Sequence, residues 1–148
     1  MTVREVYLTE PLKEKLISLS EDWERENSCH GYRKNEAKDL EDKRVFLALD
    51  GEEISGYLFG HFEIAEKDTS VYTAGTKYFE VDEIYVKPHL RSKGIGKKLF
   101  RYAEKQVGTD TKIIKLSTAT KNFNAILHFY IDELGMEFWS ATLFKKIR

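Results

Sequence analysis

A basic turn with two glycines, residues 91–96 (Arg-Ser-Lys-Gly-Ile-Gly), is the segment whose residue types predict a chemistry most clearly. It lies between an apolar segment, 81–86, that is typical of a strand and an amphipathic segment from Ile95 onward that is typical of a helix. The first N–H groups of a helix lack partners within the helix, and the helix dipole adds partial positive charge beside them. Glycine lets the main chain approach a bound group closely and take positive φ. We therefore expect an anion such as a phosphate to bind here.

Two common phosphate-binding motifs do not fit this turn. A Walker A loop needs glycine five residues before Gly96, where this chain has Arg91, and it needs Ser or Thr directly after Lys97. A dinucleotide fingerprint would need glycine at Leu99. The remaining pattern is a strand, Arg-x-x-Gly-x-Gly and a helix, although an ordinary loop with solvated basic residues is the competing interpretation.

This pattern resembles the pyrophosphate-binding segment of the GCN5-related N-acetyltransferases, the GNAT family. A second segment, 122–135, is similar to the other cofactor-side helix of that family through Ala125, Phe129, Tyr130 and the sequence Leu134-Gly135-Met136. Together the two segments cover roughly the C-terminal half of the chain. The N-terminal half matches the family only in the order of its elements.

The resemblance implies that acetyl-CoA is a co-substrate. The main-chain amides of the turn would bind the diphosphate, and two basic side chains would add positive potential: amides of Ser92, Lys93, Gly94, Ile95 and Gly96, side chains of Arg91 and Lys97. The pantetheine arm would pair with the backbone of a strand that is splayed from its neighbour, at Ile84, Tyr85 and Val86. Asn122 and Asn124 would cap the following helix or reach the pantetheine amides, one residue in each role.

The apolar pattern of segment 79–86 changes phase midway, because Phe79 and Val81 share one parity and Ile84 and Val86 share the other. A single β-bulge near residues 82–83 would point all four side chains into the core. A strand that is buried on both faces would explain the same letters. Bulges often lie beside active sites, so this segment is a candidate location for catalytic groups.

Acetyl transfer to an amine needs a base, because a protonated amine has no lone pair for the thioester carbonyl. Many members of the GNAT family place that base where this chain has Glu83. Glu80 and Asp82 lie close by and compete for the role, and Glu83 could instead form an ordinary cross-strand ion pair.

The leaving thiolate is served in many family members by a tyrosine on the second helix, which the resemblance assigns to Tyr130. The spacing departs from the family pattern, since one extra residue precedes Tyr130 after Ala125 and one more precedes Gly135. Each extra residue rotates a helical side chain by about 100°. A buried aromatic residue is therefore the alternative for Tyr130.

The resulting functional hypothesis is an N-acetyltransferase that moves an acetyl group to a primary amine of a small molecule or peptide by direct transfer in a ternary complex. A non-catalytic acyl-CoA-binding sensor or assembly module is the alternative. Small members of the family often pair, so a homodimer is possible. The net charge of −1 argues against a nucleic-acid partner, and no cluster has the spacing of metal ligands, so no metal is expected.

The 148 residues predict one domain, 1–148, without a membrane-spanning segment. The only cysteine, Cys29, cannot form an internal disulfide, and the start of the chain does not resemble a signal peptide, so a cytoplasmic location is expected. The fold class is α/β, with a mixed sheet of six or seven strands that is splayed centrally and flanked by about four helices. Strands are expected at 3–8, 45–49, 54–64, 79–86, 112–118 and 136–147, and helices from Pro11, within 24–42, from Ile95 to about Gly108 and over 122–133.

Overall fold

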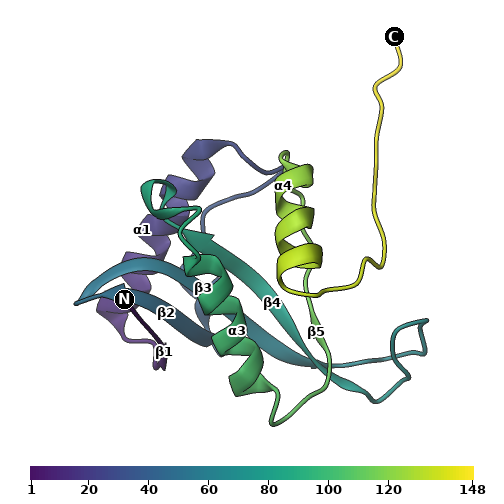
Figure 1. Cartoon of the computed structure of the whole chain (residues 1–148), viewed down its shortest axis with the longest axis horizontal. Helices are drawn as coiled ribbons and strands as arrows, with labels where there is room; N and C mark the ends of the chain where they lie inside the picture. Colours follow the sequence, from purple (N-terminus) through teal and green to yellow (C-terminus); the bar gives the residue numbers. More distant parts are fainter.

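A five-stranded sheet in the order β1-β2-β3-β4-β5 forms the centre of the protein in the computed structural model, which describes residues 1–148 (Figure 1). The strands are β1 (Thr2–Val6), β2 (Arg44–Asp50), β3 (Glu53–Ile64), β4 (Lys77–Val86) and β5 (Ile114–Lys115). All neighbours are antiparallel except β4 and β5, which are parallel. The α/β fold class is confirmed, whereas the strand count is five and not six or seven.

Helices cover both faces of the sheet. They are α1 (Glu10–Glu26), α2 (Ala37–Leu40), α3 (Ile95–Val107) and α4 (Phe123–Leu127), with a 3₁₀ turn η1 (Pro88–Leu90) and a π-helical turn η2 (His128–Glu133) that continues α4. The Thr9 hydroxyl caps α1 by accepting a hydrogen bond from Leu12 N at 3.3 Å, as expected for a helix that starts beside Pro11. The long first helix therefore begins where the sequence pattern places it.

The core consists of two apolar clusters, one on each face of the sheet. Leu16 of α1 and Leu40 of α2 pack against the face that carries Tyr57, Phe59 and Tyr85. The opposite face carries the other cluster, in which buried residues of α3 meet inward side chains of β2, β3 and β4: Phe46, Leu58, Phe79, Val81, Leu99 and Phe100. Two covered faces explain why successive residues are buried in β2 and in the first part of β3, where exposed and buried positions do not alternate.

The predicted β-bulge is present in β4. Phe59 of β3 lies opposite Glu83 and the next residue, Gly60, lies opposite Val81, so Asp82 is the extra residue. The bulge places Ile84 on the same face as Val81 and directs Glu83 to the α1 side of the sheet. The bulge therefore accounts for the change of phase in the apolar pattern of this strand.

Gly60 makes room for this bulge, and Gly60→Ala is expected to destabilise the protein. A Cβ atom at this position would overlap the carbonyl oxygen of Glu80 and lie 2.7 Å from the ring of Phe79. Such overpacking costs about 1–3 kcal/mol, measurable by urea unfolding. Ile64→Ala, at a 56% exposed position of the same strand, serves as a control that should change stability by less than about 0.5 kcal/mol. Equal stability of the two variants would contradict the assigned packing.

The C-terminal strands differ from the prediction. The strand expected over 112–118 is limited to Ile114–Lys115, and the one expected over 136–147 is absent, because the tail runs away from the sheet without forming a ladder (Figure 1). Trp139 contacts Tyr72 at 5.7 Å between ring centroids, but Leu143 and Ile147 are 86% and 91% exposed. The residue types favour a strand, yet a strand forms only where another backbone pairs with it. No helix combines the length and the apolar character needed to span a bilayer.

Candidate active site

The turn after β4 has the conformation of an anion cradle. Ser92 has φ of 63° and Gly94 has φ of 84°, and Gly94 is the N-cap of α3. The first hydrogen bond of α3 runs from Lys98 N to Gly94 O at 3.1 Å. The six amides from Ser92 to Lys97 therefore donate no hydrogen bond within the chain. Such a row of unpaired N–H groups at a helix N-terminus suits a diphosphate.

The basic side chains of this turn differ in their surroundings. The guanidinium of Arg91 donates two hydrogen bonds to the carboxylate of Glu26, at 2.7 and 2.9 Å, and one to Val86 O at 2.8 Å. Its charge is thus balanced by the last residue of α1, a contact that the sequence did not indicate. Lys97 lines the adjoining cleft, whereas Lys93 does not.

Strands β4 and β5 separate directly below the turn. Their pairing ends where Glu80 lies opposite Lys115, but β4 continues to Val86 with a partner only on its β3 side. A cleft of about 1000 Å³ opens between this part of β4 and residues 116–120. The predicted splay is therefore present, although it lies between β4 and the edge strand β5 and not at the centre of the five-stranded sheet. Ile84, Tyr85 and Val86 form one wall of the cleft.

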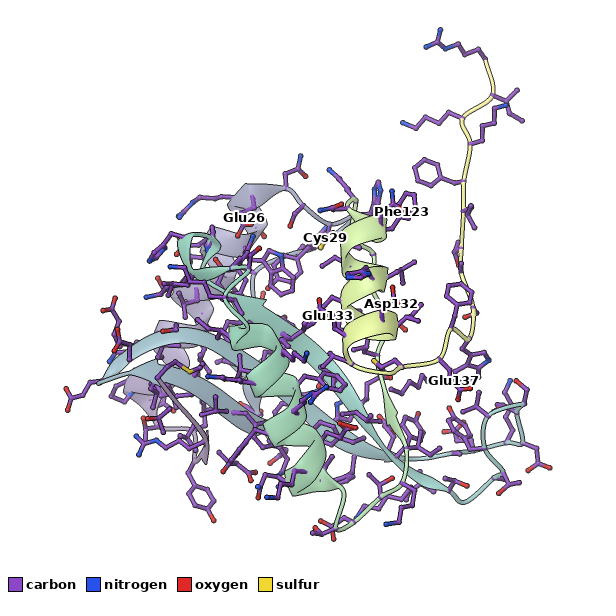
Figure 2. All side chains as sticks on the ribbon, viewed as in Figure 1. Glu26, Cys29, Phe123, Asp132, Glu133 and Glu137 are labelled. Carbon is purple, nitrogen blue, oxygen red and sulfur yellow. The ribbon has the colours of Figure 1, made fainter.

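The connection after α1 crosses the open end of this splay. His30 N donates to Ala119 O, and Lys121 N donates to Ser28 O, both at 2.8 Å, with Cys29 opposite Thr120. Figure 2 shows Glu26, Cys29 and Phe123 at this same end of the molecule. The contact joins residues about 90 positions apart, so no local pattern of the sequence predicts it.

Glu83 lies in the cleft with its carboxylate held by two tyrosines. Its Oε1 atom accepts hydrogen bonds from the hydroxyls of Tyr32 and Tyr57, each at 2.9 Å. Burial raises the pKa of Glu83, and the charge of Asp82 raises it further, while hydrogen bonds from Tyr32 and Tyr57 and the nearby Asn35 amide oppose the rise. A carboxylate with a raised pKa takes up a proton more readily than an exposed one.

The two competing carboxylates have partners of their own. Asp82 accepts a hydrogen bond from Lys43 Nζ at 2.9 Å and lies 2.7 Å from Nδ1 of His61. Glu80 pairs with Lys115 at 3.8 Å and is not part of the cleft wall. Of the three acidic residues on β4, Glu83 is the one that faces the cleft with only neutral hydrogen-bond partners.

Aromatic rings line the wall next to Glu83. Trp23 of α1 lies 4.3 Å from the ring of Tyr32 and 5.4 Å from that of Tyr85. Burial raises the pKa of Tyr85 to about 12, and the charge of Glu26 contributes to the rise. These neutral hydroxyls and rings give the wall hydrogen-bond donors without added charge.

Tyr130 reaches the cleft from the opposite side. The π-helical turn η2 contains it, and a π turn accommodates one residue more than an α turn, which accounts for the longer spacing seen in the sequence. Its ring packs near Phe100, with centroids 6.5 Å apart, and its edge lines the cleft. Burial and the nearby Cys29 raise the pKa of Tyr130 to about 12, so the hydroxyl stays protonated at neutral pH and can donate a proton.

The two asparagines at the start of α4 separate in space. Asn122 is the N-cap residue and lines the cleft, but its side chain makes no capping hydrogen bond. Asn124 lies outside the cleft wall. Asn122 is therefore the better placed of the two to reach a ligand in the cleft.

Comparisons with known proteins agree with this geometry. Residues 8–136 match the acetyltransferase (GNAT) family. An aminoglycoside acetyltransferase from an uncultured soil metagenomic sample, meta-AAC0020 in complex with sisomicin, has 18% identity and a TM-score of 0.67, with 99% of this chain and 97% of that chain covered.

Two other solved structures have the same fold. The aminoglycoside acetyltransferase AAC(6')-Iy, in complex with a bisubstrate analog, has 15% identity and a TM-score of 0.67 over 100% of this chain and 99% of the other. A transcriptional regulator from Bacillus halodurans C-125 has 21% identity and a TM-score of 0.69 over 99% and 100%. No curated protein is significantly similar in sequence.

The family match extends over most of the chain and includes both segments that the sequence pattern singled out. The unpaired amides and the splay match the anion site and the open strand edge that are expected for binding of coenzyme A. The chain therefore belongs to the acetyltransferase (GNAT) family, as an N-acetyltransferase with acetyl-CoA as its co-substrate.

Proposed function

We propose that this protein transfers an acetyl group from acetyl-CoA to a primary amine of a small molecule or peptide by direct transfer in a ternary complex. One observation carries the proposal: the open side of β4 leads from the unpaired amides of residues 92–97 past Val86 to Glu83. A thioester whose diphosphate rests on the amides would extend along this edge toward the carboxylate.

The protein groups would then act in sequence. Glu83, directly or through a water molecule, accepts a proton from the ammonium group of the acceptor, which gives the nitrogen a lone pair. The nitrogen bonds to the acetyl carbon as the carbon–sulfur bond breaks. A main-chain N–H near Val86 would polarise the carbonyl, and the Tyr130 hydroxyl would protonate the departing sulfur. The nitrogen loses its second proton as the amide forms, and this proton, carried by water, would restore the Tyr130 hydroxyl, while Glu83 releases its proton to solvent.

A small-molecule acceptor is favoured over a peptide by the fold relatives, two of which are aminoglycoside acetyltransferases. The cleft supports a cationic acceptor, because Glu83 and the rings of Trp23, Tyr32 and Tyr85 lie on the same side of it. Carboxylates and aromatic faces both attract ammonium groups.

The test follows free thiol release with acetyl-CoA and a panel of polyamines, aminoglycosides, amino acids and peptides. We expect turnover with at least one small cationic amine and formation of its N-acetyl product by mass spectrometry. Binding of acetyl-CoA without turnover across the panel would favour the rival function, a non-catalytic acyl-CoA-binding module.

Tyr130→Phe is expected to lower kcat by about 10- to 100-fold and to leave the KM for acetyl-CoA within about twofold. The ring still packs against Phe100, but the donor to the departing sulfur is lost. Steady-state kinetics by thiol release measure both constants. Tyr102→Phe, on α3 and outside the cleft wall, serves as the control, and equal rates for the two variants would remove the assigned role of Tyr130.

A further inference from the structure

The carboxylate of Glu83 is held unevenly by its neighbours. Both tyrosine hydroxyls donate to the same oxygen, Oε1, from two different elements: Tyr32 lies in the connection after α1 and Tyr57 lies on β3. The other oxygen, Oε2, has no partner in the chain and is not enclosed by it. One oxygen is therefore anchored and the other remains available to the cleft.

A third donor lies beside this carboxylate. Asn35 is 6% exposed, and its Nδ2 atom is buried without a hydrogen-bond partner. Its backbone is fixed, since Asn35 N donates to Ser20 Oγ at 2.9 Å and that hydroxyl donates to Ile17 O at 2.7 Å. The Asn35 amide is also among the groups that favour the ionised form of Glu83. A buried donor without a partner is costly, so its natural acceptor is the nearby carboxylate.

We propose that Tyr32, Tyr57 and Asn35 form a clamp that holds Glu83 through neutral hydrogen-bond donors and leaves Oε2 free to receive the proton of the acceptor amine. This inference rests on the proposed function of Glu83 as the base. The three are positioning residues, because they act on the reaction through Glu83.

The clamp resolves two opposing requirements on Glu83: its side chain is buried in the protein, yet it must be ionised to act as a base. Burial raises the pKa of Glu83 and so favours its protonated form, and a protonated carboxyl cannot accept a proton. A cationic partner would favour ionisation but would also repel a cationic acceptor and weaken the base. Neutral hydroxyl and amide donors stabilise the carboxylate without either effect.

The other ionisable groups around Glu83 do not provide this stabilisation. Asp82, the adjacent residue on β4, carries a like charge and is paired with Lys43 and His61 on the far side of the bulge. From α1, Glu26 is engaged by Arg91 and by the hydroxyl of Tyr85, farther along β4. The balance at Glu83 therefore depends on the three clamp residues.

The experiment measures the titration of Glu83 directly. Carboxyl carbons of the glutamates are labelled with ¹³C, the Glu83 signal is assigned by its loss in Glu83→Gln, and its midpoint is followed by NMR in the free protein. Tyr32→Phe, Tyr57→Phe and Asn35→Ala should each raise the midpoint, and the double variant of the two tyrosines should raise it most. Tyr72→Phe, which removes a hydroxyl contacted by Lys115, is the matched control and should leave it unchanged. All variants are measured in a His61→Gln background as well, so that titration of His61 does not contribute.

Kinetics supply the second readout. On the acidic limb of the kcat/KM profile, Tyr32→Phe should lose about tenfold in rate, while the alkaline plateau should fall by less than about threefold. A purely structural role of the tyrosines would lower both parts of the profile equally. Unchanged Glu83 midpoints in the three variants would overturn the clamp. Raised midpoints in a protein without turnover would support the clamp and overturn the role of Glu83 as the base.

Discussion

Replacing Gly94 with aspartate is expected to weaken acetyl-CoA binding by at least about a hundredfold. Gly94 has φ of 84° and no atom within 4 Å of a would-be Cβ, so a side chain there would project into open space beside the unpaired amides. A carboxylate at this position would itself accept hydrogen bonds from the amides and would repel the diphosphate. Isothermal titration calorimetry with acetyl-CoA measures the loss.

Gly94→Asn separates the charge from the conformational strain. Asparagine has nearly the shape of aspartate and tolerates positive φ about as well, but it is neutral. The affinity of the Gly94→Asn variant for acetyl-CoA should remain within about tenfold of that of the parent protein. Gly75→Asp, at φ of 88° in an exposed loop, controls for strain elsewhere and should leave binding intact. Unchanged affinity of Gly94→Asp would remove the phosphate assignment and, with it, the argument for the open strand edge.

The features that the sequence predicted well are those encoded by neighbouring residues. The cradle needs only the local pattern of glycines between a strand and a helix. The bulge at Asp82 is indicated by the apolar residues on either side of it, which change from odd to even positions. The unusual spacing before Tyr130 is also local: it predicted a rotated side chain, and the structure accommodates the extra length in a π turn. Local backbone geometry explains all three.

The partners of the site residues could not be predicted in the same way. Tyr32 and Tyr57 meet Glu83 from positions 51 and 26 residues away, and Arg91 meets Glu26 across 65 residues. Nothing in a single sequence distinguishes such pairs from other tyrosines or carboxylates. The pairing of β3 with β4 brings Tyr57 to Glu83, whereas Glu26 and Tyr32 reach their partners from α1 and the connection after it. The aromatic residues near position 23–32 were a weak signal, visible among the charges of the connection.

The tail shows the opposite failure, in which a strong local pattern does not determine structure. Residues 137–148 are rich in aromatic and β-branched or aliphatic residues, yet they form no strand. Strand formation depends on a partner edge, and β5 pairs through only two residues. Strand propensity alone therefore overestimated the size of the sheet.

Glu83→Gln is expected to lower kcat/KM by about 10²–10⁴-fold on the alkaline plateau while acetyl-CoA affinity stays within about twofold. Glutamine keeps an oxygen that can accept from Tyr32 and Tyr57 but cannot take up a proton. In the parent protein the rate should rise with pH as Glu83 ionises, and burial places this limb above the pH range of an exposed glutamate. The variant should lose that limb, so the ratio of the two rates should grow as pH increases. A ratio that is constant with pH would remove Glu83 as the base.

Thermal unfolding of the same variant gives an independent check of the direction in which folding shifts the pKa of Glu83. Because the pKa of Glu83 is raised in the folded protein, the folded state binds its proton more tightly than the unfolded chain, and ionisation lowers stability as pH rises. Glu83→Gln cannot ionise and escapes this loss. Its Tm relative to the parent protein should therefore be higher at pH about 8 than at pH about 4. A relative Tm that falls over this range would mean that the site favours the carboxylate over the acid, and Glu83 would then be too weak a base for the proton transfer assigned to it.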